Sequence, residues 1–245
     1  MSIAGTENVN SEENGYDGTA FNVGIGSKLV INDSIILAYN IERSTTAGGG
    51  DSANFEITDS RVRFADIDGN AANGGNWTIE NSSFALETVG SYGLSANSIT
   101  TKNSTIDATN VGYSAIYAYK SIDFGANTKV NIENCGTKLP YVSEGNYGDS
   151  KAPIQMKVTH EADGDEVAAE DMSFEIASTA TITIKDCVSD GTSNNVIYIP
   201  ANVTFENKGT INADVETSEE SDYVVVTYMS GGTRYDFDVV EKGYI

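Results

Sequence analysis

Apolar and polar residues alternate with a period of two in short runs along most of the chain. Runs such as FEIT (55–58), WTIE (77–80) and ITIK (182–185) place an apolar side chain at every second position. This period is typical of β-strands, whereas an α-helix repeats every ~3.6 residues. The runs are β-branched and are bounded by Asn, Gly and Ser, which favour turns. The pattern therefore predicts many short strands and no long helices.

One phrase recurs within this pattern: apolar, any, apolar, any, Asn or Asp, and then usually Ser or Cys. Its Asn or Asp (Asx) positions are Asp33, Asp59, Asn81, Asn103, Asn134, Asp186 and Asn207, spaced by 26, 22, 22, 31, 52 and 21 residues. A unit of about 22 residues fits most of these spacings, and 52 is interpreted as two units plus an insertion. Short strands repeated at this interval predict a solenoid whose coils stack ~4.8 Å apart.

The alternation also predicts which way the side chains point. If Phe55 and Ile57 point inward, Asp59 does too, so we expect the Asx positions to form an internal ladder. Cys135 and Cys187 then replace the Ser of other coils, with one coil between them. That places them ~9–10 Å apart, beyond the reach of a disulfide. Trp77 is predicted to lie in the core.

The coil length, the three short strands per coil and the predicted Asn ladder resemble the pectate-lyase type of right-handed parallel β-helix. The resemblance covers roughly residues 20–215. It implies an all-β, single-stranded solenoid with about 22 residues per coil. This scaffold carries polysaccharide lyases and hydrolases, phage tailspikes, autotransporter passengers and binding regions of bacterial surface adhesins. Fold alone does not choose among these functions.

The ends and the longest coil break the regular repeat. Residues 1–20 are expected to be a lead-in or N-terminal cap, and residues 21–213 the β-helix, with insertions at about 136–152 and 158–172. Residues 214–245 read as an acidic linker and a β-hairpin, which caps the last coil or begins a following domain. We expect the chain to be a piece of a longer protein, next to neighbouring domains.

Tyrosines are the strongest candidates for ligand binding. If Ile116 and Ala118 point inward, Tyr117 and Tyr119 point outward, and aligning the coils puts Tyr117, Gln155 and Tyr198 in one outward column. Exposed tyrosines on a rigid strand face can stack on sugar rings, while Gln bonds the hydroxyl groups. Alternatively, these aromatics pack beneath the 136–172 loops. Candidate ligand-binding residues are Tyr117, Tyr119, Gln155, Tyr198 and Tyr147.

The charge balance narrows the set of partners. The chain has 14 Lys and Arg against 36 Asp and Glu, for a net charge of −22. Nucleic acids and anionic membrane surfaces are poor partners for such a chain, because both require clustered cations. No apolar run approaches the ~18 residues of a membrane span. The single histidine, His160, makes His-based metal sites and Ser-His-Asp triads poor candidates.

Acidic loops offer candidate Ca²⁺ sites. Asp163, Asp165 and Glu166 lie close together in the second insertion, and a second acidic stretch occupies residues 66–70. Ca²⁺ needs six to eight oxygen ligands, and neither stretch has the full EF-hand pattern. The alternative is that these acids are simply solvated. Ca²⁺ is therefore a candidate cofactor, and the sequence predicts no other.

The sequence gives little support for a group of catalytic residues. A lyase needs a basic group beside bound Ca²⁺, but the outward Arg61 and Arg63 are predicted to neighbour Ser83 and Ala85 in the next coil. A hydrolase needs two facing carboxylates ~5–10 Å apart. The outward acids are read as ordinary surface charges.

The sequence therefore favours a non-catalytic domain of a secreted or cell-surface bacterial protein, of the adhesin type, that binds a polysaccharide or glycan. A structural stalk or filament module is the second hypothesis, and a polysaccharide lyase or hydrolase is the third.

Overall fold

The protein is all-β, and its strands form two large sheets. The computed structural model describes residues 1–4, 19–41, 47–50, 52–139, 152–157, 159–160, 166–167, 171–187, 195–200, 203–214, 224–230 and 233–239. No residue in these ranges lies in a helix, as the alternation predicts. It follows that no helix among them is long and apolar enough to cross a membrane.

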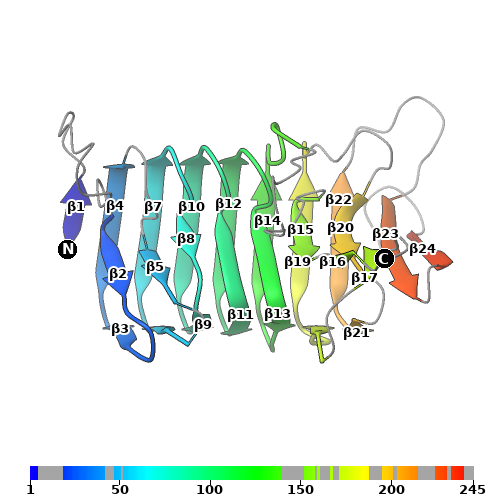
Figure 1. The fold of residues 1–245 in the computed structure, drawn as a ribbon, viewed down its shortest axis with the longest axis horizontal. Coiled ribbons are helices and arrows are strands. Elements are labelled where there is room, and N and C mark those ends of the chain that lie inside the picture. The colour runs from blue at the N-terminus through cyan, green and yellow to red at the C-terminus, as the bar shows by residue number, and fades with distance from the viewer. Residues whose placement is uncertain are drawn as a thin grey trace.

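The first sheet has eight strands, all paired in parallel. Their order is β1 (Ser2–Ala4), β4 (Ile35–Ile41), β7 (Arg61–Ile67), β10 (Ser83–Val89), β12 (Thr105–Val111), β14 (Lys129–Glu133), β19 (Thr181–Lys185) and β22 (Thr210–Asp214). Figure 1 shows these strands side by side along the long axis of the molecule.

The second sheet has fourteen strands in two arms that are joined through the long strands β11 (Leu94–Lys102) and β13 (Ile116–Phe124). One arm adds β2 (Phe21–Val23), β5 (Ala47–Gly49), β8 (Ala72–Asn73), β15 (Ile154–Met156), β20 (Asn195–Ile199), β23 (Val224–Ser230) and β24 (Thr233–Val239). The other adds β3 (Lys28–Asn32), β6 (Asn54–Thr58), β9 (Asn76–Glu80), β18 (Ser173–Ile176) and β21 (Thr204–Asn207). Only β23 and β24 pair antiparallel in this sheet, within the part of the chain described. A separate antiparallel pair joins β16 (Thr159–His160) to β17 (Glu166–Val167).

The chain forms one strand in each arm of the second sheet and then one strand in the first sheet. We call such a set of three strands a row, and the next three strands form the next row along the molecule. β2, β3 and β4 are thus followed by β5, β6 and β7, each paired with the strand three positions earlier. Hydrogen bonds between central rows join residues 22 apart, as at Ser60 and Ser82, while the first rows are 26 apart. This arrangement is compatible with a parallel β-helix, and whether β23 and β24 cap it stays a prediction.

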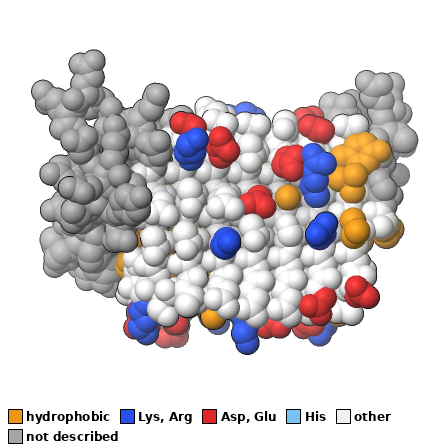
Figure 2. All heavy atoms as spheres, turned by 180° about the vertical axis from the view of Figure 1, so that it is seen from behind, with side chains coloured by type: hydrophobic (Ala, Val, Ile, Leu, Met, Phe, Trp, Pro, Cys, Tyr) orange, Lys and Arg blue, Asp and Glu red, His pale blue; other side chains and the backbone are white. Residues whose placement is uncertain are grey.

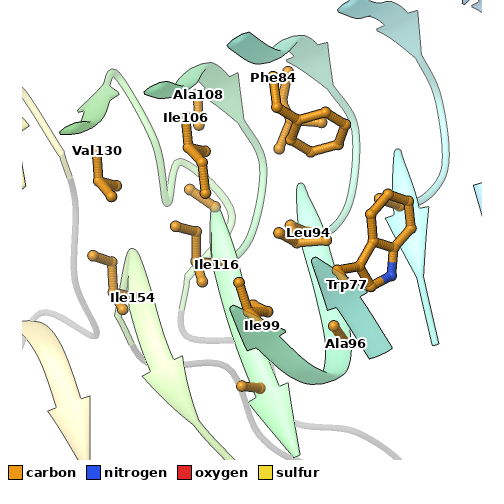
Figure 3. Close-up of a cluster of buried hydrophobic side chains, with 14 of the residues drawn as sticks. Trp77, Phe84, Leu94, Ala96, Ile99, Ile106, Ala108, Ile116, Val130 and Ile154 are labelled. Carbon is orange, nitrogen blue, oxygen red and sulfur yellow. The ribbon is translucent and has the colours of Figure 1, made fainter. Parts of the chain in front are cut away.

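The core lies between the sheets and is filled from all sides. Figure 3 shows Phe84, Ile106 and Val130 of the eight-stranded sheet facing Leu94, Ile99 and other apolar residues of the second sheet. Trp77 is 2% exposed, stacks on Phe55 at a ring-centroid distance of 4.1 Å and donates from Nε1 to the Gly74 carbonyl at 2.8 Å. The predicted inward positions Phe55, Ile57 and Trp77 are confirmed.

The prediction of an internal Asx ladder is wrong, because these residues lie at corners of the chain and their side chains point outward. At the corner that leads into the eight-stranded sheet, Asp33, Asp59, Asn81, Asn103 and Asn127 have positive φ, from 46° to 55°, and are exposed. A positive φ turns the backbone and ends the alternation, so the Asx side chain points outward. Asn and Asp tolerate this left-handed conformation better than other non-glycine residues. On the surface, Asn103 donates to Asn81 at 3.1 Å and Asn127 to Asn103 at 2.9 Å.

The residue after each Asx at this corner points inward instead. Ser60, Ser82 and Ser104 are buried. Each hydroxyl donates to the carbonyl two residues earlier, at 2.6–2.8 Å, and accepts the N–H of the Ser one row before it, at 3.0–3.1 Å. A buried serine ladder therefore holds successive rows in register.

The two cysteines belong to a different corner, which follows the strands of the eight-stranded sheet. There Asn40, Asp66, Thr88, Asn110, Asn134 and Asp186 have positive φ, and the buried residues that follow are Ile41, Ile67, Val89, Val111, Cys135 and Cys187. The prediction that the cysteines replace Ser is therefore wrong, since they continue a column of Ile and Val. The recurring sequence motif thus occurs at two different corners, both of which have an Asn or Asp with positive φ followed by a buried residue.

The prediction of a coil between the cysteines is also wrong. β14 pairs directly with β19, and Glu133 lies opposite Lys185. The spacing of 52 residues is therefore one row that carries long excursions, rather than two rows plus an insertion. Sequence spacing could not reveal this, because chain length between rows does not fix the number of rows.

Candidate functional site

The predicted tyrosine column exists, but it is buried. Tyr117 of β13 lies opposite Gln155 of β15, which lies opposite Tyr198 of β20. Their exposed fractions are 1%, 0% and 6%, and Tyr198 packs against Ala152. Gln155 Oε1 accepts the Ala152 N–H at 3.3 Å. The alternative in which these side chains are covered thus describes the structure, and a sugar could stack on Tyr117 only if its cover moved.

Three partly exposed tyrosines lie around Tyr117 and form the surface that we call the tyrosine cluster: Tyr92, Tyr113 and Tyr119. The Tyr92 ring centroid lies 5.3 Å from that of Tyr113 and 5.4 Å from that of Tyr117. Tyr119 lies 5.2 Å from Tyr117. All three contacts are edge-to-face, the geometry that aromatic pairs prefer. The rings therefore hold one another in fixed orientations.

Stacked turns place Tyr92 and Tyr113. The Tyr92 N–H donates to Asn70 Oδ1 at 3.2 Å, and the Tyr113 N–H donates to the Ser91 carbonyl at 3.1 Å. Glycine allows these turns to approach closely, because a Cβ at Gly90 would lie 2.2 Å from the Asp68 carbonyl oxygen. Tyr92 and Tyr113 could not be assigned to the site by strand parity, since they lie outside the strands.

A cation stands beside the cluster. Lys157 Nζ lies 5.3 Å from the centre of the Tyr119 ring, within the range of a cation–π contact. Lys157 follows β15, one row beyond Tyr119. The cluster thus combines partly exposed rings with a hydrogen-bond donor, in a protein that is otherwise strongly acidic.

The remaining predicted ligand-binding residue, Tyr147, lies outside the described residues, as do Asp163 and Asp165. Only the backbone of Glu166 is described, in the β16–β17 pair. Among the side chains that the structure does describe, no group of three or more His, Cys, Asp or Glu could hold a metal ion. The Ca²⁺ site at 163–166 stays a prediction.

Carboxylates do stack in one outward column of the second sheet, at positions that the sequence analysis missed. Asp123 of β13 lies opposite Glu175 of β18, which lies opposite Glu206 of β21. Partial burial, and then the neighbouring Glu175 carboxylate, raise the pKa of Asp123. Because all three side chains lie on the outward face of their strands, this column offers no enclosed acid pair of the kind that a hydrolase uses.

The strand-face charges considered as catalytic groups have other neighbours. Arg61 and Arg63 are exposed on β7 and lie opposite Ser83 and Ala85, as expected. Arg63 donates two hydrogen bonds to the Glu87 carboxylate. Glu56 forms an ion pair with Lys28. Arg63 and Glu56 are therefore engaged in surface ion pairs.

Comparison with protein families finds no matching family model. Comparisons with curated proteins and with solved structures likewise find no significant match. The geometry of the tyrosine cluster and the charge of the chain are therefore the features that bear on function.

Proposed function

We propose that the chain is a right-handed parallel β-helix domain of a bacterial surface protein, and that it binds a glycan without catalysis. The supporting observation is the tyrosine cluster, in which Tyr92, Tyr113 and Tyr119 are partly exposed and fixed by edge-to-face contacts. Sugar rings present apolar C–H faces that pack on aromatic rings, and their hydroxyl groups accept hydrogen bonds. Lys157 supplies a donor for such an acceptor.

Charge restricts the class of glycan. At a net charge of −22, the protein repels polyanions over distances up to the Debye length, ~8 Å at physiological ionic strength. Neutral polysaccharides avoid this repulsion, whereas a polyuronate would need bridging cations or low pH. We therefore favour a neutral glycan as the ligand.

A glycan array tests the proposal. Wild type is compared with a Tyr92→Ala/Tyr119→Ala variant at pH 5 and pH 7.4, each with and without Ca²⁺. Loss of two stacking rings should weaken binding at least about tenfold, equivalent to ~1.4 kcal/mol. Tyr39→Ala is the matched control, because Tyr39 is a partly exposed tyrosine on β4 of the other sheet. Its binding should equal that of wild type.

Two results would reject the proposal. One is the absence of binding to any glycan under all four conditions, with folded protein verified by circular dichroism. The other is equal binding by the wild type and the Tyr92→Ala/Tyr119→Ala variant. Turnover of any polysaccharide on the array would instead favour the lyase or hydrolase hypothesis.

A structural stalk module is the second candidate, and one observation favours it. The outward positions of β4 are apolar, whereas the next strand of the same sheet, β7, carries Arg61 and Arg63 there. Ile35 is 68% exposed, and Leu37 and Tyr39 on the same side of β4 are partly exposed. Figure 2 shows an apolar patch at one end of a face that otherwise carries scattered charges. If the chain is a stalk module, we expect light scattering to show self-association that rises with protein concentration. Ile35→Ser should weaken this self-association.

A further inference from the structure

Two buried thiols lie in successive rows at the end of the eight-stranded sheet. Cys135 follows β14 and Cys187 follows β19, and these strands pair in register through Glu133 and Lys185. Adjacent parallel strands are ~4.8 Å apart, so equivalent Cα atoms lie within the ~4.4–6.8 Å that disulfides span. Their separation of 52 residues in sequence hides this proximity.

A hydrogen bond places the sulfur atom of Cys187 directly against Cys135. The Cys135 N–H donates to Cys187 Sγ at 3.3 Å. Each thiol also donates to the carbonyl two residues earlier, Cys135 to Glu133 at 3.3 Å and Cys187 to Lys185 at 3.2 Å. Both side chains therefore point to the same side of their strands, toward the core.

We propose that Cys135 and Cys187 form an intramolecular disulfide that joins two successive rows when the protein meets an oxidising environment. Both cysteines are free thiols in this structure. Among the described residues, the rest of their column is Ile41, Ile67, Val89 and Val111, so a disulfide would occupy an otherwise apolar position.

The two cysteines differ in a way that sets the order of the reaction. Cys187 is 8% exposed and Cys135 is fully buried, so the oxidant reaches Cys187 first. Hydrogen bonding from Cys135 lowers the pKa of the Cys187 thiol, while the hydrogen bond to Cys187, and then burial, raise the pKa of Cys135. The thiolate, which is the attacking species, therefore forms at Cys187.

The oxidant is a low-molecular-weight disulfide such as oxidised glutathione. The Cys187 thiolate attacks one of its sulfur atoms, and one glutathione thiolate leaves. Cys135 then loses its proton and attacks Cys187 Sγ, which releases the second glutathione thiolate. In sum, two cysteine thiols are oxidised to one disulfide, and one glutathione disulfide is reduced to two thiols that take up both protons.

The disulfide would close a long ring within the fold. The ring contains both predicted insertions, 136–152 and 158–172, together with β15 and β18. Closure limits the unfolded chain and should raise Tm by roughly 5–10 °C. The disulfide thus would strengthen the row that interrupts the regular repeat.

Oxidation of the full chain tests the proposal. The protein is incubated with oxidised glutathione, both folded and during refolding, and is then denatured without reductant. The expected result is a monomer that has lost two hydrogens in mass, has no reactive thiol and gives a Cys135–Cys187 peptide on digestion. Its Tm should exceed that of the reduced protein.

A Cys135→Val/Cys187→Val variant is the matched control, because Val occupies this column at Val89 and Val111. It should fold, and its Tm should not change with oxidant. The proposal is overturned if both oxidation routes leave two free thiols, stop at a glutathione adduct of Cys187, or give only intermolecular dimers. It is also overturned if the oxidised wild type is no more stable than the reduced wild type.

Discussion

At the scale of single residues, the sign of φ decides which way a side chain points. Parity predicts that Asp59 follows Ile57 inward, yet a φ of 50° turns Asp59 outward and Ser60 inward. Asn and Asp fill nearly all the positions of this kind at the two corners. Among the described residues, Thr88 is the exception, with a φ of 54°. A β-branched residue is strained in this conformation, because the second heavy atom on its Cβ crowds the backbone, whereas Asn and Asp have unbranched side chains that can hydrogen-bond locally.

Thr88→Asn should therefore stabilise the protein. The neighbouring positions in the column are Asp66 and Asn110, which shows that this corner accommodates Asx side chains. We expect a gain of about 0.5–1.5 kcal/mol, or ~2–4 °C in Tm, measured by thermal unfolding. Thr109→Asn is the control, because Thr109 lies in the extended strand β12, where Asn gives no such relief. A Tm no higher than that of wild type would show that Thr88 is unstrained.

At the scale of elements, turns and corners bind the rows together through polar side chains in the interior. The serine ladder supplies an acceptor for a backbone N–H that would otherwise be buried without one. An unsatisfied buried donor costs about 1–3 kcal/mol. The ladder can be recognised in the sequence as the recurring Ser after each Asx, although its inward direction cannot.

Ser82→Ala tests this role, because it removes the acceptor of the Ser60 N–H. We expect a loss of about 1–3 kcal/mol in the free energy of unfolding, measured by denaturant unfolding. Ser83→Ala is the matched control, since Ser83 is the next residue, points outward and is partly exposed. Similar losses in both variants would contradict a specific role for the ladder.

At the scale of the whole molecule, stacking brings together charges that are far apart in the sequence. Asp123, Glu175 and Glu206 come from three rows and share one outward column. Glu206 forms an ion pair with Lys208, so the repulsion that remains lies between Asp123 and Glu175. This repulsion is therefore a cost in folding free energy, and the cost grows as pH rises and the carboxylates ionise.

Asp123→Asn should relieve that cost. The folded-state pKa of Asp123 is raised by burial and by Glu175, so the folded protein binds this proton more tightly than the unfolded chain does. The resulting stabilisation is complete below the unfolded pKa of ~3.9 and is lost as pH rises through the folded pKa. The substitution should thus raise Tm by roughly 1–2 °C at pH 7 and by less at pH 3. The exposed Asp68→Asn serves as the control, and an equal gain at both pH values would contradict the argument.

The sequence by itself determined the all-β class, the inward set represented by Phe55, Ile57 and Trp77, and the shared column of Tyr117, Gln155 and Tyr198. These features follow from an alternation of two and a regular repeat, which are both local in the chain. Only the tertiary structure decided that Cys135 stacks directly on Cys187, that the Asx side chains point outward, and that Tyr117 is covered while Tyr92 and Tyr119 reach the surface. The direction of the Asx side chains depends on the sign of φ at the corner, which strand parity does not include. The other two depend on what lies in the next row, and the length of chain between rows varies too much for spacing to reveal it.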